Sequence, residues 1–248
     1  MGGAGKPPLV ILHGILGSSR NWAGAGPRLA EHFEVHALDL PSHGQSPHMD
    51  AMTFETMAQQ VAKWIDACDL GPVILLGHSL GGKVAMTLAS ISPDWLVRLI
   101  IADIAPRDYS PHSLEAIEAM LALDLSALQS RKEAEDGLRQ RVPDLGLRRF
   151  LLTNLVRGED QQFRWQANLE AIHQSLSGLG RNPMAQRLPH TGPALFLKGE
   201  HSDFVRDRDD AVILQYFPQA TIHTIAAAGH NLHFDNLPAF VEAVTGPF

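Results

Sequence analysis

The chain has 248 residues, of which 45% are hydrophobic and 19% are charged, with a formal net charge of −7 and one cysteine, Cys68. This length suffices for a single globular domain with a sizeable core and an inserted lobe. A negative net charge without a Lys/Arg run argues against nucleic acid or an anionic membrane surface as a partner, and one cysteine excludes an internal disulfide.

The ends and apolar runs of the chain bear on its location. No apolar run approaches the roughly 18 residues of a membrane-spanning helix. The opening MGGAGKPPLVILHG has one lysine and a short apolar run, which is not the layout of a signal peptide. We therefore expect no membrane span and a cytoplasmic location, which suits a single free cysteine. The oligomeric state leaves no mark on the sequence.

Short apolar runs along the chain predict β-strands. The most apolar runs are continuous rather than alternating, which is typical of parallel strands buried on both faces. The predicted strands cover residues 9–12, 34–40, 72–77, 97–103, 194–199 and 221–225.

Helical patterns lie between these runs. One amphipathic helix is predicted between Thr53, a suitable N-cap, and Gly71, a suitable stop. A second runs from Leu80, with apolar residues at every fourth position, until Pro93 ends it. The alternation predicts an α/β fold, with a mostly parallel sheet of about six strands and helices on both faces. The apolar face of the first helix comprises Phe54, Met57, Val61, Trp64, Ile65 and Cys68.

The alternation stops between residues 107 and 188, where no strand-like run occurs. We call residues 107–188 the inserted segment. Its composition predicts helices, with a capping-box pattern from Ser130 to Glu133 and stops at Gly158 and Gly178.

We expect the inserted segment to form a helical cap, or lid, over the carboxyl ends of the strands. Those ends are where open α/β sheets bind ligands. Residues 1–106 and 189–248 would then form the core domain.

The pentapeptide GHSLG, residues 77–81, stands between a predicted strand and a predicted helix. In a nucleophile elbow the serine occupies a strained turn, and the flanking positions are glycines because a Cβ there would clash. Gly77 and Gly81 fill those positions. We therefore predict that Ser79 is a catalytic nucleophile rather than an incidental serine in a glycine-rich joint.

A serine nucleophile needs a base that takes its proton and a carboxylate that orients the base. His230, in AAAGHNLHF, follows the last predicted strand, where the histidine of such a triad is expected. His233 is the runner-up. His223 lies within a predicted strand and is interpreted as scaffold.

The residues alone leave two aspartates open as the acid. Asp203, beside Ser202, follows the strand in ALFLKGEHSD, and Asp103 ends the strand in LIIAD. Each also has a structural interpretation: Asp103 as part of a turn with Pro106, and Asp203 as the N-cap of a helix near Val205.

A tetrahedral oxyanion needs two preorganised N–H donors. We predict the N–H of Leu80, after the nucleophile, and the N–H of Ile15, after the first strand. His13 is interpreted mainly as a structural hydrogen-bonding residue and otherwise as part of the substrate pocket. Trp22 and Trp165 are candidates for the pocket wall or for the core.

Several motifs together resemble one family over nearly the whole chain. The chain is similar to the α/β-hydrolase fold family, and to a branch of small cytosolic esterases that pair HG-x-LGS-x-x-NW with GHS-x-GGK and DIAP. By this resemblance Asp103, in DIAP, becomes the first choice for the acid, and Ser202 assists near the histidine. The resemblance implies a serine carboxylesterase for short acyl esters or thioesters, without a cofactor or metal. The motifs are LHGILGSSRNW, DLPSHGQS, GHSLGGKVAM, ADIAP, LKGEHSDFV and AGHNLHF.

Other functions fit the same residues. A C–C bond hydrolase of aromatic ring-cleavage products would need cationic groups for a dienoate, and the candidate arginines lie only in the inserted segment. A cofactor-free perhydrolase would use the same triad. A ligand receptor that signals through its lid is the alternative outside enzymes, but a complete Ser/His/Asp set favours catalysis. Haloalkane dehalogenation is disfavoured because it needs a carboxylate where Ser79 stands.

Overall fold

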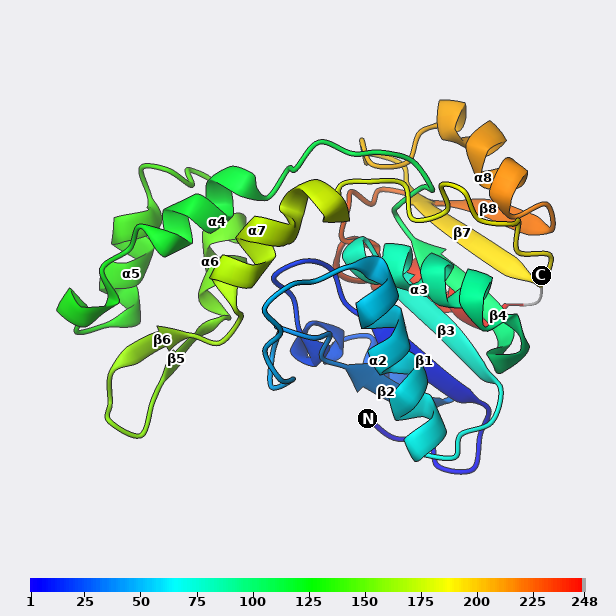
Figure 1. Cartoon of the computed structure of the whole chain (residues 1–248), viewed down its shortest axis with the longest axis horizontal. Helices are drawn as coiled ribbons and strands as arrows, with labels where there is room; N and C mark the ends of the chain where they lie inside the picture. The colour runs from blue at the N-terminus through cyan, green and yellow to red at the C-terminus, as the bar shows by residue number, and fades with distance from the viewer. Residues whose placement is uncertain (247–248) are drawn as a thin grey trace.

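The computed structural model describes residues 1–246 and centres on a six-stranded sheet in which every pairing is parallel. The strand order is β2-β1-β3-β4-β7-β8 (Figure 1). All six predicted strands are present, with ends shifted by at most two residues. Their bounds are β1 Pro8–Leu12, β2 Glu34–Leu38, β3 Val73–His78, β4 Leu96–Ala102, β7 Ala194–Gly199 and β8 Ala220–Ile225.

Helices cover both faces of the sheet because its strands alternate apolar side chains between two cores. From β1, Val10 and Leu12 join a core with helices α2 and α3, whereas Leu9 and Ile11 join a second core with α1 and α10. The core helices are α1 Gly26–Leu29, α2 Phe54–Ala67, α3 Leu80–Ile91, α8 Asp210–Tyr216, α9 Leu232–Asp235 and α10 Leu237–Thr245. Short 3₁₀ turns are η1 Ser19–Trp22, η2 Pro93–Trp95 and η4 Asp207–Asp209.

Helix α2 follows its predicted limits. The Thr53 side chain accepts a hydrogen bond from the N–H of Thr56, which caps the first turn. Gly71 has φ +65°, a conformation that favours glycine, and lies beyond the helix end. Cys68 departs from the predicted apolar face: it is exposed, because it is the C-cap residue and lies past the last buried turn.

The inserted segment contains four helices that lie to one side of the core in Figure 1. The side chain of Ser130 accepts a hydrogen bond from the N–H of Glu133 at 3.2 Å, which is one half of the predicted capping box. The side chain of Glu133 accepts from the N–H of Gln129 and not from that of Ser130. The bounds are α4 Leu114–Leu121, α5 Arg131–Leu138, α6 Leu145–Leu152 and α7 Leu169–Leu179, with the 3₁₀ turn η3 Leu125–Ala127.

Two expectations for the inserted segment are wrong. It is not purely helical, since β5 (Leu155–Arg157) and β6 (Phe163–Trp165) form an antiparallel hairpin. Gly158 does not end a helix but lies in the hairpin turn, where its N–H donates to the carbonyl of Gln162. Gly178, the other predicted stop, is the penultimate residue of α7, which ends at Leu179 with Gly180 as its C-cap.

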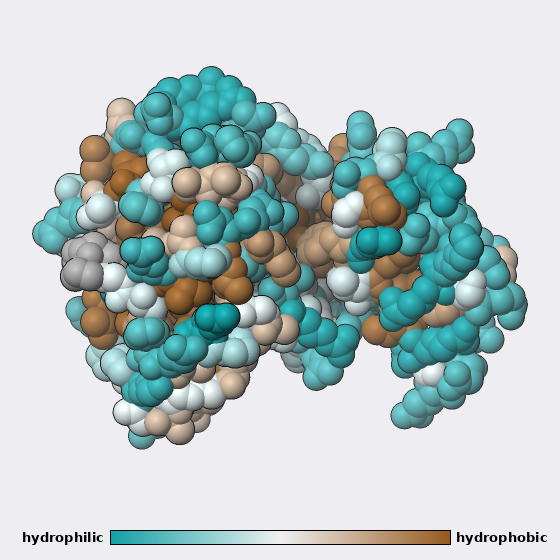
Figure 2. All heavy atoms as spheres, turned by 180° about the vertical axis from the view of Figure 1, so that it is seen from behind, coloured by the Kyte–Doolittle hydropathy of each residue, from teal (hydrophilic) through white to brown (hydrophobic). Residues whose placement is uncertain are grey.

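The sheet reverses its direction of growth at β1, which pairs with both β2 and β3. In open α/β sheets, such a switch point leaves a crevice at the carboxyl ends of the strands. Figure 2 shows a hollow between the core and the inserted segment, with hydrophobic surface on both sides.

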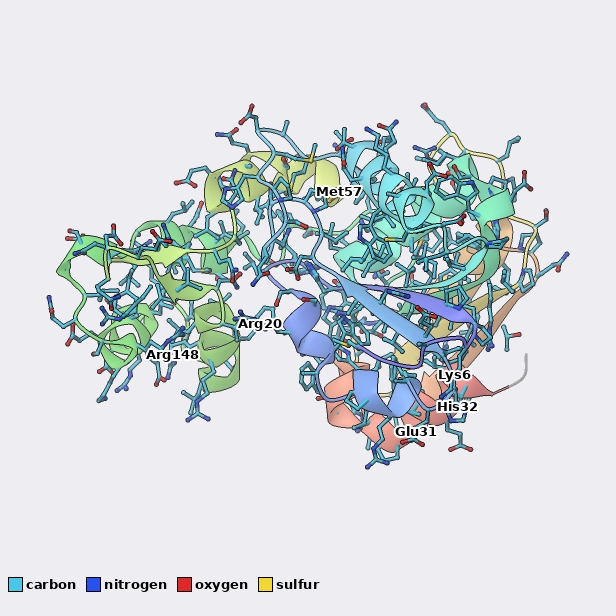
Figure 3. The ribbon with its side chains drawn as sticks, turned by 90° about the horizontal axis from the view of Figure 1, so that it is seen from below. Lys6, Arg20, Glu31, His32, Met57 and Arg148 are labelled. Carbon is cyan, nitrogen blue, oxygen red and sulfur yellow. The ribbon has the colours of Figure 1, made fainter. Side chains whose placement is uncertain are left out.

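The opposite edge of the molecule is held by local contacts. Nζ of Lys6 donates to the carbonyls of Ala30 at 2.8 Å and Glu31 at 2.9 Å. Figure 3 shows Lys6, Glu31 and His32 together at this edge, far from Arg148 on α6. No helix within residues 1–246 is long and apolar enough to cross a bilayer.

Candidate active site

Ser79 joins β3 to α3 in a strained conformation, with φ +51° and ψ −114°. The turn is so tight that glycine is required on both sides of it. A Cβ on Gly77 would lie 2.3 Å from the carbonyl oxygen of Gly81, and one on Gly81 would lie 2.4 Å from that of Leu12. The local geometry is therefore that of a nucleophile elbow.

Asp103 follows β4, also at positive φ (+53°), and its side chain is fully buried. Its Oδ1 accepts a hydrogen bond from the N–H of Gly199 at 3.0 Å. Its Oδ2 accepts from Nδ1 of His230 at 2.8 Å and from the hydroxyl of Ser202. An imidazole that donates through Nδ1 keeps a lone pair on Nε2, which is the arrangement a general base needs.

Asp203, the alternative acid, lies elsewhere. Its side chain is exposed and pairs with the guanidinium of Arg206 at 2.6 Å. Nor does it cap a helix near Val205, because the nearest helical turn, η4, begins after Arg206. The structure thus brings Asp103, Ser202 and His230 together and leaves Asp203 outside.

Two further rings pack against His230. Nε2 of His78 donates to the backbone carbonyl of His230 at 2.8 Å, and the two ring centroids are 4.7 Å apart. The ring of Phe204 stacks on the imidazole, with centroids 3.7 Å apart and planes at 18°. Burial lowers the pKa of His78 well below its usual value, so His78 is neutral at pH 7.

His233, the runner-up base, is buried and stacks on Trp22 with ring centroids 4.2 Å apart. Among the described residues neither of its ring nitrogens has a hydrogen-bond partner. Burial lowers the pKa of His233 to about 4. His223, on β8, is exposed. In the same part of the chain, residues 1–246, no group of His, Cys, Asp and Glu is placed to hold a metal ion.

His13 and Gly14 shape the wall beside Ser79. Nδ1 of His13 donates to the carbonyl of Gly14 at 2.7 Å, and Nε2 accepts from the N–H of Leu40 at 2.9 Å. Burial lowers the pKa of His13 to about 4, which keeps this brace neutral. A Cβ on Gly14 would lie 3.3 Å from Cβ of Ser79, so only a small residue fits there.

The two predicted oxyanion donors flank this wall. Within residues 1–246 the hydrogen bonds leave the N–H groups of Ile15 and Leu80 without a protein acceptor. Both residues line the cavity that contains Ser79.

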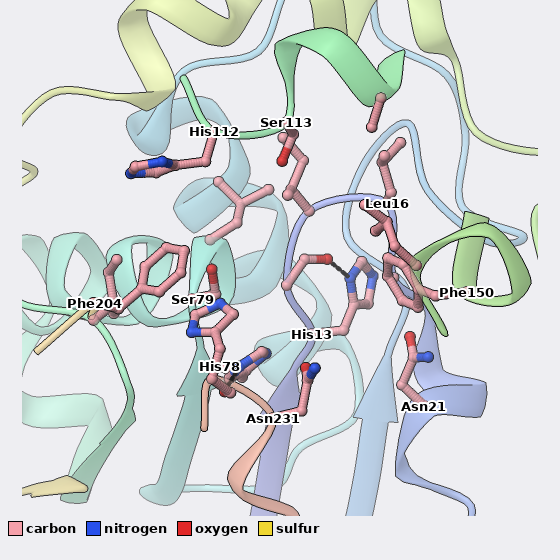
Figure 4. A pocket seen from close by; sticks show the side chains of 18 of the residues that line it. His13, Leu16, Asn21, His78, Ser79, His112, Ser113, Phe150, Phe204 and Asn231 are labelled. Carbon is pink, nitrogen blue, oxygen red and sulfur yellow. Dashed lines mark hydrogen bonds between the residues drawn. The ribbon is translucent and has the colours of Figure 1, made fainter. Parts of the chain in front are cut away.

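That cavity has a volume of about 720 Å³ and lies between the core and the inserted segment. Figure 4 shows Ser79, His78 and Asn231 near its centre, with Phe204 on one side and Phe150 of the inserted segment on the other. Trp22 lines it from a fully buried position. Trp165 does not: its Nε1 donates to the carbonyl of Met120 at 3.1 Å. The apolar lining includes Ile15, Leu16, Leu80, Ala116, Leu147, Phe150, Leu151, Leu176 and Leu179.

Sequence reasoning overlooked Lys83, which connects α3 to the inserted segment. Its buried Nζ donates to the carbonyls of Leu179 at 3.3 Å, Gly180 at 2.9 Å and Arg181 at 2.6 Å. Cations are favoured at a helix C-terminus, here that of α7. Burial lowers the pKa of Lys83 to about 7. The sequence signal for this contact is a lysine within the otherwise apolar stretch GGKVAM, because a buried amine needs hydrogen-bond acceptors.

Comparison with known proteins places these features in a family. The sequence profile of the alpha/beta hydrolase fold matches residues 7–237. The chain belongs to the α/β-hydrolase fold family. This α/β-hydrolase is 38% identical over 252 residues to sn-1-specific diacylglycerol lipase ABHD11 of Mus musculus, covering 98% of this chain and 81% of the relative.

Two further proteins that this α/β-hydrolase resembles are named esterases. It is 32% identical to Esterase YbfF of Escherichia coli (strain K12), covering 96% of this chain and 91% of the relative. The solved structure of a marine microorganism esterase superposes with a TM-score of 0.95 at 37% identity, over 98% of this chain and 95% of the other. The α/β-hydrolase is therefore a carboxylic ester hydrolase of the esterase/lipase type.

Proposed function

We propose that this protein is a serine carboxylesterase that cleaves short-chain acyl esters or thioesters through an acyl-enzyme on Ser79. One observation carries the proposal: the hydrogen bond of 2.8 Å between Asp103 and His230, at the cavity that also holds the serine of the elbow. A buried carboxylate that fixes the tautomer of an imidazole beside a strained serine is the arrangement of a catalytic triad.

Acylation begins when Oγ of Ser79 attacks the acyl carbonyl while Nε2 of His230 takes its proton. The N–H groups of Leu80 and Ile15 hold the oxyanion of the tetrahedral intermediate. His230 then protonates the departing alcohol or thiol. Among the described residues no hydrogen bond joins the Ser79 hydroxyl to the His230 ring, whose Nδ1 donates to Asp103. Contacts between a nucleophile and its base commonly tighten only when substrate binds.

Deacylation repeats these roles with water as the nucleophile. His230 accepts a proton from the water as its oxygen attacks the acyl carbon. Collapse of the second intermediate returns that proton to Oγ of Ser79 and releases the carboxylic acid. Asp103 stays ionised throughout and stabilises the transient imidazolium.

We also propose that the inserted segment, residues 107–188, works as a cap on a core of residues 1–106 and 189–248. Its side chains Leu147, Phe150 and Leu176 line the cavity, and an apolar wall there suits an acyl chain. For the same enzyme we propose a small-molecule acyl ester as the binding partner and the cytoplasm as the place of action.

A second candidate substrate is diacylglycerol, which the name of the mouse relative specifies. The relationship over 98% of the chain favours it, as does the apolar lining of the cavity. A panel of p-nitrophenyl esters of increasing acyl length, measured beside diacylglycerol, separates the two. Activity that is highest for the short esters supports the first proposal.

The decisive test replaces Ser79 with alanine and measures hydrolysis of p-nitrophenyl butyrate. Turnover should fall by about 10³- to 10⁶-fold, because the acyl-enzyme can no longer form. His230→Ala should fall similarly, whereas His201→Ala, at an exposed histidine, is the control. A fluorophosphonate or p-nitrophenyl phosphonate should transfer its phosphonyl group to Oγ of Ser79, with release of fluoride or p-nitrophenolate, so that the wild type gains the mass of that group and Ser79→Ala does not. Near wild-type turnover by Ser79→Ala would refute the proposal.

A further inference from the structure

The ring of Phe204 covers one face of the His230 imidazole, with nearly parallel planes 3.7 Å apart at the centroids. The bond to Asp103 fixes one atom of the imidazole but leaves the ring free to tilt about that contact. Proton transfer requires Nε2 to face Oγ of Ser79, and a tilted ring would turn Nε2 away from it. A planar ring stacked on the imidazole restricts the tilt, so Phe204 acts on orientation rather than on chemistry.

The backbone of Phe204 is itself held on both sides. Its N–H donates to the hydroxyl of Ser202 at 3.1 Å. Its carbonyl accepts from the hydroxyl of Tyr109 at 2.7 Å and from Nη2 of Arg107 at 3.1 Å. The Tyr109 hydroxyl also accepts from the N–H of Ala105 at 2.9 Å, which ties it to the loop after β4.

Tyr109 lies near the start of the inserted segment and Gly180 near its end; we call these two connecting parts of the segment its stems. The N–H of Tyr109 donates to the carbonyl of Gly180 at 2.7 Å. The same carbonyl accepts from Lys83 on α3. One continuous set of contacts therefore runs from both stems through Tyr109 to Phe204 and the imidazole.

We propose that Phe204 is a positioning residue that fixes the plane of the His230 imidazole. Tyr109 couples it to the stems of the inserted segment, so that proton transfer depends on how these stems are seated. This inference rests on the proposed role of His230 as the general base.

The first experiment separates ring stacking from simple filling of space. Phe204→Tyr keeps the planar ring and should retain kcat within about 3-fold, whereas Phe204→Ala should lose about 10- to 100-fold, the scale of a misplaced catalytic group. Phe204→Leu keeps apolar volume without a planar ring, and its kcat should lie nearer to alanine than to tyrosine. If leucine serves as well as tyrosine, or if only KM changes, the positioning role is wrong.

The second experiment tests the coupling. Tyr109→Phe removes the hydroxyl and both of its hydrogen bonds, of which only the one to the carbonyl of Phe204 bears on the imidazole. It should lower kcat by about 3- to 10-fold, the scale of that one bond, with KM unchanged. Tyr216→Phe is the matched control, because it also removes only a hydroxyl: that of Tyr216 accepts from Nδ2 of Asn182 at 3.5 Å and has no contact with Phe204 or Tyr109. Its kcat should equal wild type. Unchanged kcat in Tyr109→Phe, or an equal loss in both variants, overturns the coupling.

These outcomes are distinct from failure of the esterase proposal. Wild-type protein that leaves p-nitrophenyl butyrate intact refutes the esterase proposal itself. If the wild type is active and the Phe204 and Tyr109 variants have the kcat of the wild type, only the positioning role is refuted. Near-ultraviolet circular dichroism identifies any variant that has lost its fold, and Phe204→Tyr then remains as the test of the ring.

Discussion

Oδ2 of Asp103 lies 2.8 Å from Nδ1 of His230, although 127 positions separate the two residues in the chain. The contact forms because Asp103 follows β4 and His230 follows β8, so both lie at the carboxyl edge of one sheet. Oδ1 of the same carboxylate is occupied by the N–H of Gly199. Both oxygens are thus used, and the carboxylate has a fixed orientation.

The two aspartates that the sequence left open can be separated by isosteric replacement. Asp103→Asn should lower turnover by about 10⁴-fold, because an amide favours the wrong tautomer of His230. Asp203→Asn, at an exposed ion pair, should stay within about 3-fold of wild type. Steady-state hydrolysis of p-nitrophenyl butyrate measures both. Similar losses in the two variants would contradict the assignment of Asp103.

Ser202 shares Oδ2 of Asp103 with His230. Ser202→Ala removes one of the donors to that carboxylate, and we expect kcat to fall by about 10- to 100-fold, as for the loss of one hydrogen bond to a charged group. The fall should be much smaller than in Asp103→Asn. A loss as large as that of Asp103→Asn would mean that the serine is indispensable to the triad.

The elbow should tolerate no side chain at position 81. Gly81→Ala places a Cβ 2.4 Å from the carbonyl oxygen of Leu12, so we expect it to destabilise the fold by about 3 kcal/mol or more. Gly178→Ala is the control, because nothing lies within 4 Å of its Cβ inside α7. That variant should gain about 0.5–1 kcal/mol of helix stability. Urea unfolding measures both, and equal stabilities would contradict the geometry.

His233 predicts acid sensitivity. Its folded pKa of about 4 lies below the unfolded value of 6.5, so the folded state binds fewer protons between these pH values. The free energy of unfolding therefore has its full value, as far as His233 is concerned, above pH 6.5 and decreases as the pH falls from 6.5 toward 4. His233→Phe should reduce the slope of unfolding free energy against pH in this window by up to about 1.4 kcal/mol per pH unit. An unaltered slope would contradict the prediction.

Much of the fold could be predicted because its signals are local. The strands are continuous apolar runs, and each buried strand needs such a run wherever it lies in the sheet. The elbow motif is also local in the sequence: a Cβ on Gly77 would clash with Gly81, four residues on, although the space at Gly81 is limited by Leu12 of β1. Strand order is not local, and it decides which strand ends become neighbours.

The remaining features depend on contacts that no periodicity encodes. The hairpin of β5 and β6 was missed because three residues per strand are too few for a pattern. The residue type alone leaves Trp165 open between the pocket wall and the core, and only its position on β6 shows that its Nε1 donates to the carbonyl of Met120. Asp103 and Asp203 each follow a predicted strand, and what separates them is their contacts: Asp103 accepts from His230, whereas Asp203 pairs with Arg206.

Lys83 lies one helical turn beyond Ser79 and donates hydrogen bonds to three carbonyls at the end of α7. The same short helix therefore starts at the proposed nucleophile and anchors the inserted segment. Exchanging that segment for one from a relative, to change specificity, has to preserve a carbonyl cluster opposite position 83. A graft without it would leave a buried amine without acceptors on the first turn of the helix that follows Ser79.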